Sequence, residues 1–253
     1  MRDLVASLTP SPLKRWHQGY LERRFNAVAG PIRETYLARY GAVVRRGPFE
    51  GLQCVERSAA IAKLVGSYEL EIHDAVGDLV GRRPELVVNI GCGDGYFTCG
   101  LARLLPDTEI RGYDTDPPTQ ALCLEQVALN DLGGNVLVGG ECTTEMLAAM
   151  PAQGTALVID CEGAEVDLLN PVAAPSLRTW PILVELHDFN VPGATDTIVG
   201  RFSGTHDIEL IEARDRAAFD APELSQLTPT ERAVAVNEFR PPNMRWAYMV
   251  PKG

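Results

Sequence analysis

The sequence predicts an α/β fold: a doubly wound, mostly parallel seven-stranded sheet with helices on both faces and an N-terminal helical arm. Two observations carry this prediction. Short runs of Val, Ile and Leu alternate with helical segments from Pro84 onward, and such runs are typical of parallel strands buried on both faces. A glycine-rich turn at 91–95 joins the first of these runs to a helix.

The elements follow one another in a regular order. Strands are expected at 86–90, 109–113, 136–138, 156–159 and 182–186, with later candidates at 208–211 and 246–250. Helices are expected at 58–81, 96–105, 119–130, 145–150 and 165–169. In a sheet of this kind the ligand lies at the carboxyl ends of the strands, where the strand order reverses, so the chemistry is expected there.

The chain of 253 residues suits one large domain with an added arm. We expect residues 1–57 to form a helical arm or lid and residues 58–253 to form the main domain. The arm is rich in arginine, and Leu13, Trp16, Tyr20 and Phe25 recur at roughly helical spacing. It could serve as a lid, as a contact between two copies of the chain in a homodimer, or as an element that recognises the substrate.

Composition excludes several classes of partner. The net charge of −11 and the lack of a basic cluster argue against a nucleic-acid substrate and against an anionic membrane surface. The six cysteines form no C-x-x-C pair and lie in apolar runs or beside glycines, as free thiols in a reducing compartment do. No continuous apolar stretch follows Met1, so we expect a cytoplasmic protein without a signal peptide.

The glycine turn favours one cofactor class over another. After Asn89, the pattern Gly91-Cys-Gly93-Asp-Gly95 opens a helix, and glycines there allow the backbone to approach a ligand closely. The dinucleotide fingerprint needs G-x-G-x-x-G, whereas here the third glycine comes one residue early. The spacing therefore suits S-adenosylmethionine (SAM) better than a nicotinamide cofactor.

Acidic residues after the second and third strands could bind the ribose and the adenine of SAM. Asp114 directly follows the second strand, where a carboxylate can accept hydrogen bonds from the ribose hydroxyls. Asp116 precedes a proline and is more readily interpreted as a turn residue. Glu141 follows the third strand and either faces the adenine or is an acid favoured at a helix start.

The fourth and fifth strands end in a dense group of titratable residues. Asp160, Glu162 and Glu165 follow the fourth strand within six residues. On the fifth strand, Glu185 and His187 share one face because strand side chains alternate. Parallel strands bring these ends together, so this edge is expected to hold the reactive part of the site.

The segments "IDCEGAEVDLL" at 159–169, "ILVELHD" at 182–188, "NIGCGDGYF" at 89–97 and "GSYELE" at 66–71 together resemble the FkbM family of SAM-dependent methyltransferases. The resemblance covers roughly residues 60–215. It implies a Rossmann-like class I methyltransferase fold, SAM as cofactor, and methyl transfer to oxygen or nitrogen. The family's glycine motif often opens with an acid where this chain has Asn89, so Glu69 or Asp160 would have to supply the charge that pairs the SAM ammonium.

The motifs and the resemblance together give a set of expected site residues. Expected to bind the cofactor are Tyr68, Glu69, Asn89, Gly91, Cys92, Gly93, Tyr96, Asp114, Thr115, Glu141, Cys142 and Asp160. Expected to act in catalysis are His187, Glu162 and Asp160, with His187 as general base because its ordinary pKa lies near neutral pH. A magnesium ion held by Asp160, His187 and Asp188 is an alternative, but the sequence does not show that these residues converge, and no metal ligand is assigned.

The function expected is methyl transfer from SAM to a small molecule, sugar, natural product or peptide. One alternative is an NAD-dependent oxidoreductase, which shares the fold but which the glycine spacing disfavours. Another is a SAM-binding partner subunit without catalysis, which the complete acid–histidine group disfavours. Because a fold does not fix a function, the acceptor is not readable from the sequence.

Overall fold

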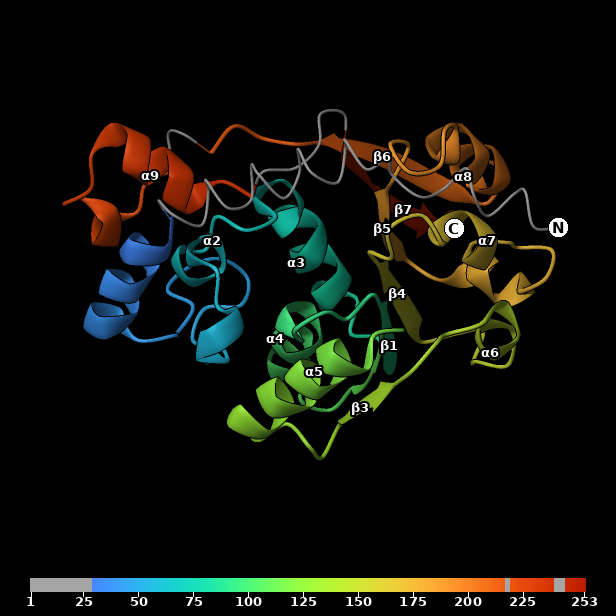
Figure 1. Ribbon diagram of the computed structural model, residues 1–253. Helices are drawn as coiled ribbons and strands as arrows, with labels where there is room; N and C mark the ends of the chain where they lie inside the picture. The colour runs from blue at the N-terminus through green and yellow to red at the C-terminus, as the bar shows by residue number, and fades with distance from the viewer. Residues whose placement is uncertain (1–28, 217–218, 239–243) are drawn as a thin grey trace, which may run out of the picture.

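A computed structural model describes residues 29–216, 219–238 and 244–253. Within these residues the chain forms one seven-stranded sheet in the order β3-β2-β1-β4-β5-β7-β6 (Figure 1). The strands are β1 (Leu86–Ile90), β2 (Glu109–Tyr113), β3 (Val136–Gly139), β4 (Thr155–Ile159), β5 (Ile182–Leu186), β6 (His206–Glu212) and β7 (Arg245–Pro251). The predicted fold class and all seven strands are confirmed.

Helices precede β1 and lie in each connection between consecutive strands. These are α2 (Ile61–Val65), α3 (His73–Gly81), α4 (Tyr96–Leu104), α5 (Pro117–Leu129), α6 (Thr144–Ala148), α7 (Glu165–Leu168), α8 (Ala194–Phe202) and α9 (Pro229–Val236). Strands β1 to β5 are parallel, whereas β7 lies antiparallel between β5 and β6. The strand order reverses between β1 and β4, which is where a ligand is expected in such a sheet.

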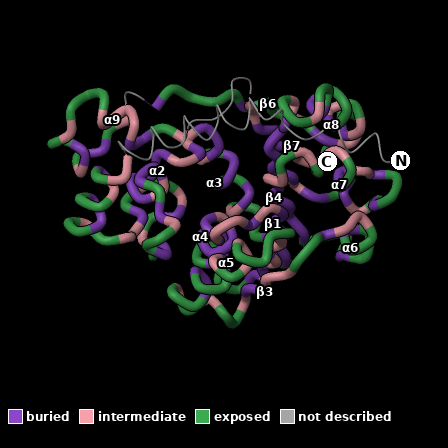
Figure 2. Tube along the Cα trace, viewed as in Figure 1, coloured by how far each residue is buried: buried purple, intermediate pink, exposed green. Residues whose placement is uncertain are grey.

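Two apolar clusters cover the two faces of the sheet. Helices α3, α4 and α5 pack with Val87 on one face, whereas α6, α7 and α8 pack with Val88 and Ile90 on the other. Strands β1, β4 and β5 are buried at every position, as the central purple segments in Figure 2 show. This explains why their sequences are continuous apolar runs rather than alternating ones.

The prediction of one helix over 58–81 is wrong. Helix α2 ends at Gly66, which adopts a left-handed conformation (φ 83°) that glycine tolerates without a Cβ clash. Glu69 also lies in the left-handed region (φ 51°), and its carboxylate accepts a hydrogen bond of 2.9 Å from the Trp246 indole on β7. The chain therefore turns twice before α3 begins at His73.

The described part of the N-terminal region packs onto the main domain. Residues 29–40 form a helix that lies near α2 and α9 (Figure 1), and Ile32, Tyr36 and Leu37 join the apolar cluster of α3 and α4. Leu13, Trp16, Tyr20 and Phe25 lie outside the described residues. The boundary after residue 57 and a dimer contact through the arm stay predictions.

Two further sequence expectations concern the cysteines and the membrane. All six cysteines are free, and all but the half-buried Cys161 are buried, which confirms their interpretation as free, mostly buried thiols. Among the described residues, no helix combines the length and the apolar character needed to cross a bilayer.

Candidate active site

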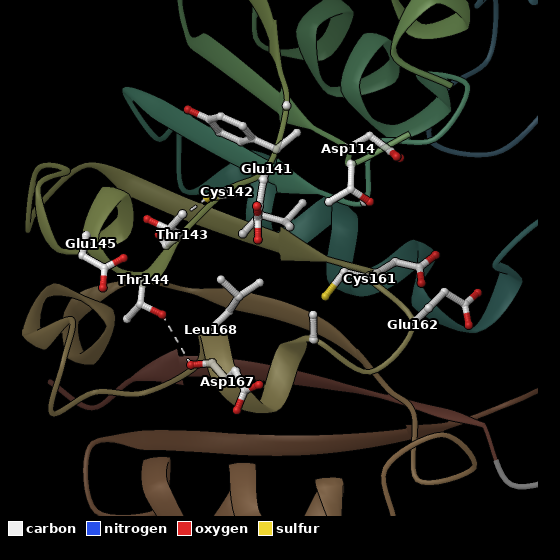
Figure 3. A pocket seen from close by; sticks show the side chains of 17 residues that line it. Asp114, Glu141, Cys142, Thr143, Thr144, Glu145, Cys161, Glu162, Asp167 and Leu168 are labelled. Atoms are coloured by element: carbon white, nitrogen blue, oxygen red, sulfur yellow. Dashed lines mark hydrogen bonds between the residues drawn. The ribbon is translucent and has the colours of Figure 1, made fainter. Parts of the chain in front are cut away.

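A cavity of 490 Å³ opens at the carboxyl ends of β1 to β4, beside the start of α7. Its volume is in the usual range of about 300–1,000 Å³ for small-molecule sites. In Figure 3, Thr144 and Glu145 lie at one end of the cavity and Cys161 and Glu162 at the other. The cavity thus occupies the position that the sheet topology indicated.

The glycine turn brings the ends of β1 and β4 together. Gly91 has φ 78°, and a Cβ there would lie 1.6 Å from the carbonyl oxygen of Asp160. The backbone N–H of Asp160 donates to the Ile90 carbonyl at 2.9 Å, which holds the two strand ends in register. Only glycine permits this approach, and both Gly91 and Asp160 line the cavity.

Asp114 is held in a fixed orientation at the end of β2. Its carboxylate accepts hydrogen bonds from the backbone N–H groups of Gly93 (3.0 Å) and Asp116 (2.9 Å). A carboxylate has about four acceptor positions, so capacity for two hydroxyl donors remains. Asp114 and Thr115 both line the cavity. Asp116 instead caps α5 by accepting from the Thr119 N–H, as its interpretation as a turn residue implied.

The loop after β3 lines the cavity beyond Asp114. Glu141 and Cys142 both lie in this wall, with Glu141 and Leu168 drawn on opposite sides in Figure 3. Helix α6 begins at Thr144 and is capped by the Thr143 side chain, so Glu141 precedes its first turn. The acid within the first turn of α6 is Glu145, whereas Glu141 lies before the cap and lines the cavity.

The cavity is strongly acidic. Its wall carries six carboxylates, at Asp114, Glu141, Glu145, Asp160, Glu162 and Asp167. Among the described residues that line it, none is Lys, Arg or His. Low-dielectric walls concentrate such a field, so the cavity favours a cationic ligand and disfavours an anionic one.

His187 lies at the end of β5 with carboxylates on both sides of its ring. Its Nδ1 is 3.2 Å from Oε1 of the fully buried Glu165. Its Nε2 is 3.5 Å from Asp160 Oδ1, 3.5 Å from Glu185 Oε2 and 3.8 Å from Glu162 Oε2. The expected catalytic residues His187, Glu162 and Asp160 therefore lie together.

The pKa values of His187 and Glu185 are both raised by their surroundings. Burial opposes the charged imidazole, but the hydrogen bond that Nδ1 donates to Glu165 and the charges of Glu165, Asp160 and Glu162 outweigh it, so the pKa of His187 is raised. Burial, followed by the charge of Asp160 and a hydrogen bond between the two carboxyl groups, raises the pKa of Glu185 to about 11. Glu185 is thus neutral at pH 7 when nothing cationic lies beside it.

Several expected cofactor residues do not line the cavity. Asn89 is buried in the middle of the sheet, where its amide donates to Thr98 Oγ1 at 2.9 Å. It therefore supports the turn from behind and does not reach the methionine part of a ligand in this cavity. Cys92 is also buried, and Gly93 meets no atom within 4 Å of its Cβ position, so both shape the turn.

Tyr68, Glu69 and Tyr96 lie on the other side of the turn. Tyr96 is buried and packs edge-on against Phe49 and Tyr68, with ring centroids 5.2 and 5.3 Å away. The Glu69 carboxylate accepts from Trp246. These three residues do not line the cavity, so of the two candidates to pair an ammonium only Asp160 does.

Asp188 does not join the other acids. The Asp188 carboxylate accepts from the backbone N–H of Thr195 (3.2 Å) and from its hydroxyl, at the start of α8. The chain has already left β5 at Leu186, so the side chain after His187 turns away from the cavity. The alternative metal site of Asp160, His187 and Asp188 is therefore wrong in its third ligand.

Sequence reasoning left Glu165 without a role and missed Asp167 and Leu168. Glu165 Oε1 accepts the backbone N–H of His187 at 3.0 Å, and Oε2 accepts that of Gly163 at 2.8 Å. A signal existed, because Glu165 opens α7 directly beneath the loop that carries Asp160 and Glu162. Asp167 and Leu168 follow on α7, and their approach to the cavity depends on how that short helix is tilted.

No protein-family model matches the sequence, and no curated protein does. Among solved structures, a protein of Clostridium thermocellum assigned as an rRNA methylase is similar, with 13% identity over 72% of this chain and 96% of that one and a TM-score of 0.52. A protein of Klebsiella pneumoniae assigned as an O-methyltransferase has 12% identity over 71% and 79%, with a TM-score of 0.50. The chain thus has the Rossmann-like fold of class I methyltransferases.

Proposed function

We propose that this protein is a SAM-dependent methyltransferase that transfers a methyl group to an oxygen or nitrogen of a small molecule or peptide. The acidic cavity at the switch point of a methyltransferase-like sheet is the observation that carries the proposal. SAM has a net positive charge, because its sulfonium and ammonium outnumber its carboxylate. NAD instead carries an anionic pyrophosphate, which the six carboxylates in the wall would repel.

The cavity offers a place for each part of the cofactor. The approach at Gly91 and the Asp160 carboxylate suit the amino-acid part and its ammonium. Asp114 has free acceptor positions for the ribose hydroxyls. Glu141 and Cys142 line the far wall, where Glu141 can accept from the adenine amine.

The cofactor would supply an electrophilic methyl group on its sulfonium, and the protein's residues would position the acceptor and manage its proton. Glu165 accepts from Nδ1 of His187 and so leaves Nε2 as the proton acceptor. The raised pKa of His187 makes it a stronger base than a free imidazole. Glu162, whose side chain is 78% exposed, can orient an acceptor that enters from solvent.

Membership of the FkbM family is part of this proposal. It is supported by the motifs at 66–71, 89–97, 159–169 and 182–188, and by the positions of the last three at the ends of β1, β4 and β5. The net charge of −11 and the acidic cavity support a small-molecule or peptide acceptor over a nucleic acid.

The experiment incubates the full chain with SAM and a panel of hydroxyl, amine and peptide acceptors, and measures S-adenosylhomocysteine (SAH) by mass spectrometry. We expect SAH formation that depends on one acceptor class. His187→Gln should bind SAM as the wild type does and lose most of its turnover, because His187 does not line the cofactor cavity. Tight SAM binding without SAH from any acceptor would instead indicate a non-catalytic SAM-binding subunit.

A further inference from the structure

Three side chains beside the cavity, of which only Asp160 lines it, bring their ligand atoms close together. Asp160 lies directly after β4, Glu185 lies in β5 and His187 follows β5. One oxygen or nitrogen atom from each of the three lies within 4.8 Å of the other two. Glu185 and His187 are each 2% exposed, whereas the Asp160 side chain is 33% exposed and lines the cavity.

The imidazole nitrogen that faces this group lacks a partner. Glu165 accepts from Nδ1, so the hydrogen of a neutral ring resides there and Nε2 presents a lone pair. Within the described part of the chain, Nε2 is buried and has no hydrogen-bond partner. Its neighbours are carboxylate oxygens at 3.5 and 3.5 Å, from Asp160 and Glu185. A buried lone pair that faces carboxyl oxygens is satisfied by a cation or a proton that lies between them.

The separations fit a bound metal ion. Two ligands each about 2.1 Å from a metal and roughly 109° apart are about 3.4 Å from each other. The observed distance from Nε2 to either carboxylate oxygen is 3.5 Å. Each carboxylate oxygen is therefore at about the distance from Nε2 that a shared ion requires, and the three ligand atoms all lie within 4.8 Å of one another.

The supporting contact has the form found around metal-bound histidines. Such histidines usually donate their second nitrogen to a carboxylate, which fixes the ring orientation. Here Glu165 accepts from Nδ1 and from the backbone N–H of the same residue, at 3.2 and 3.0 Å. The ring is thus held with Nε2 aimed at Asp160 and Glu185, whether or not an ion is present.

We propose that Asp160, Glu185 and His187 bind one divalent first-row transition-metal ion, such as Mn²⁺ or Zn²⁺. One imidazole nitrogen and two carboxylate oxygens suit these ions, whereas Mg²⁺ and Ca²⁺ prefer oxygen ligands alone. Because Asp160 borders the cavity, open coordination positions would face an acceptor oxygen or water. With the ion bound, Nε2 is a ligand and no longer a proton acceptor, so the ion would promote loss of the acceptor's proton. Metal binding itself does not depend on the proposed methyl transfer.

The experiment uses the full chain after removal of metals with a chelator, in the absence of SAM and acceptor. Titration with Mn²⁺ alone, followed by the EPR signal of the free ion, should show one tight site per chain. Pulsed EPR of the loaded protein should show coupling to a ¹⁴N nucleus, because an imidazole is a ligand. Competition should place Zn²⁺ above Mn²⁺ and Mg²⁺ below it.

Asp160→Asn and His187→Gln should each abolish the tight site, and His187→Gln should remove the ¹⁴N coupling. Asp188→Asn is the matched control, because Asp188 is an acid next to His187 whose carboxylate faces Thr195. It should bind Mn²⁺ as the wild type does. Thermal unfolding of each variant separates loss of the site from loss of the fold. Absence of a tight site in the folded wild type, or a site that survives both ligand variants, would overturn the proposal. Neither result depends on SAM, so the proposed function would stand or fall separately.

Discussion

The close approach of Gly91 to Asp160 gives a quantitative prediction for Gly91→Ala. The new Cβ would lie 1.6 Å from the Asp160 carbonyl oxygen and 2.6 Å from its carbonyl carbon. Both atoms are backbone, so no side-chain rotation relieves the overlap, and the ends of β1 and β4 must separate. A non-glycine residue at φ 78° costs about 1–2 kcal/mol, and the overlap adds about 1–3 kcal/mol. Gly91→Ala should therefore lower the free energy of unfolding by about 2–5 kcal/mol.

Gly93→Ala is the matched control within the same turn. Gly93 also has a positive φ (55°), but a Cβ there meets no atom within 4 Å. In this variant the free energy of unfolding should fall only by the cost of a non-glycine residue at positive φ, about 1–2 kcal/mol. The difference between the two variants thus isolates the contact with Asp160.

Urea denaturation measures the free energy of unfolding of both variants. An unchanged slope m, the dependence of that free energy on urea concentration, would show that the unfolded states are comparable. Calorimetry with SAM measures the second consequence. Because Gly91 and Asp160 both line the cavity, Gly91→Ala should weaken SAM binding more than Gly93→Ala does. Equal stability of the two variants would refute the account of the turn.

Three further predictions test separate contacts. Asp114→Ala should weaken SAM binding by about 1–3 kcal/mol in calorimetry, the cost of leaving buried donors unpaired, and unchanged affinity would exclude Asp114 as the ribose ligand. Burial lowers the pKa of His206 below its ordinary 6.5, so the folded state disfavours its charged form. The contribution of neutral His206 to the stability of the folded state is therefore present above pH 6.5 and is lost as the pH falls below that value. Urea unfolding of His206→Gln at pH 7.5 and 5 should show a smaller acid-induced loss than the wild type does; an equal loss would contradict this. Tyr248→Phe removes a hydroxyl that donates to Asp78 at 2.6 Å, and should cost about 1 kcal/mol in urea unfolding, whereas no loss would show the bond to be without net effect.

The sheet could be predicted because its central strands are buried on both faces. Strand β1 occupies the expected residues 86–90, and every position is buried. The helix expected over 58–81 failed because Gly66 and Glu69 adopt left-handed conformations, and Glu69 does so beside a contact with Trp246 far along the chain. A tertiary contact of this kind leaves no local pattern. Helix α8 was missed although Ala194, Ile198 and Phe202 have helical spacing and the segment lies between two expected strands, 182–186 and 208–211.

The site could be predicted where a residue directly follows a strand. Asp114 and Asp160 line the cavity for this reason, because parallel strands end at one edge. The shared face of Glu185 and His187 also followed from strand alternation, and their atoms lie 3.5 Å apart. Asn89 lies within β1 and not after it. Its side chain therefore points toward α4, where its amide donates to Thr98, and does not reach the cavity.

Calorimetric titration of the full chain with SAM, SAH and NAD tests the central claim most directly. The acidic cavity predicts micromolar binding of the adenosyl ligands and none of NAD. It also predicts that SAM binds more tightly than SAH at low salt and that this preference shrinks as salt is added, because the sulfonium charge is attracted by the carboxylates. Binding of NAD without SAM would contradict the account and place the protein among the oxidoreductases.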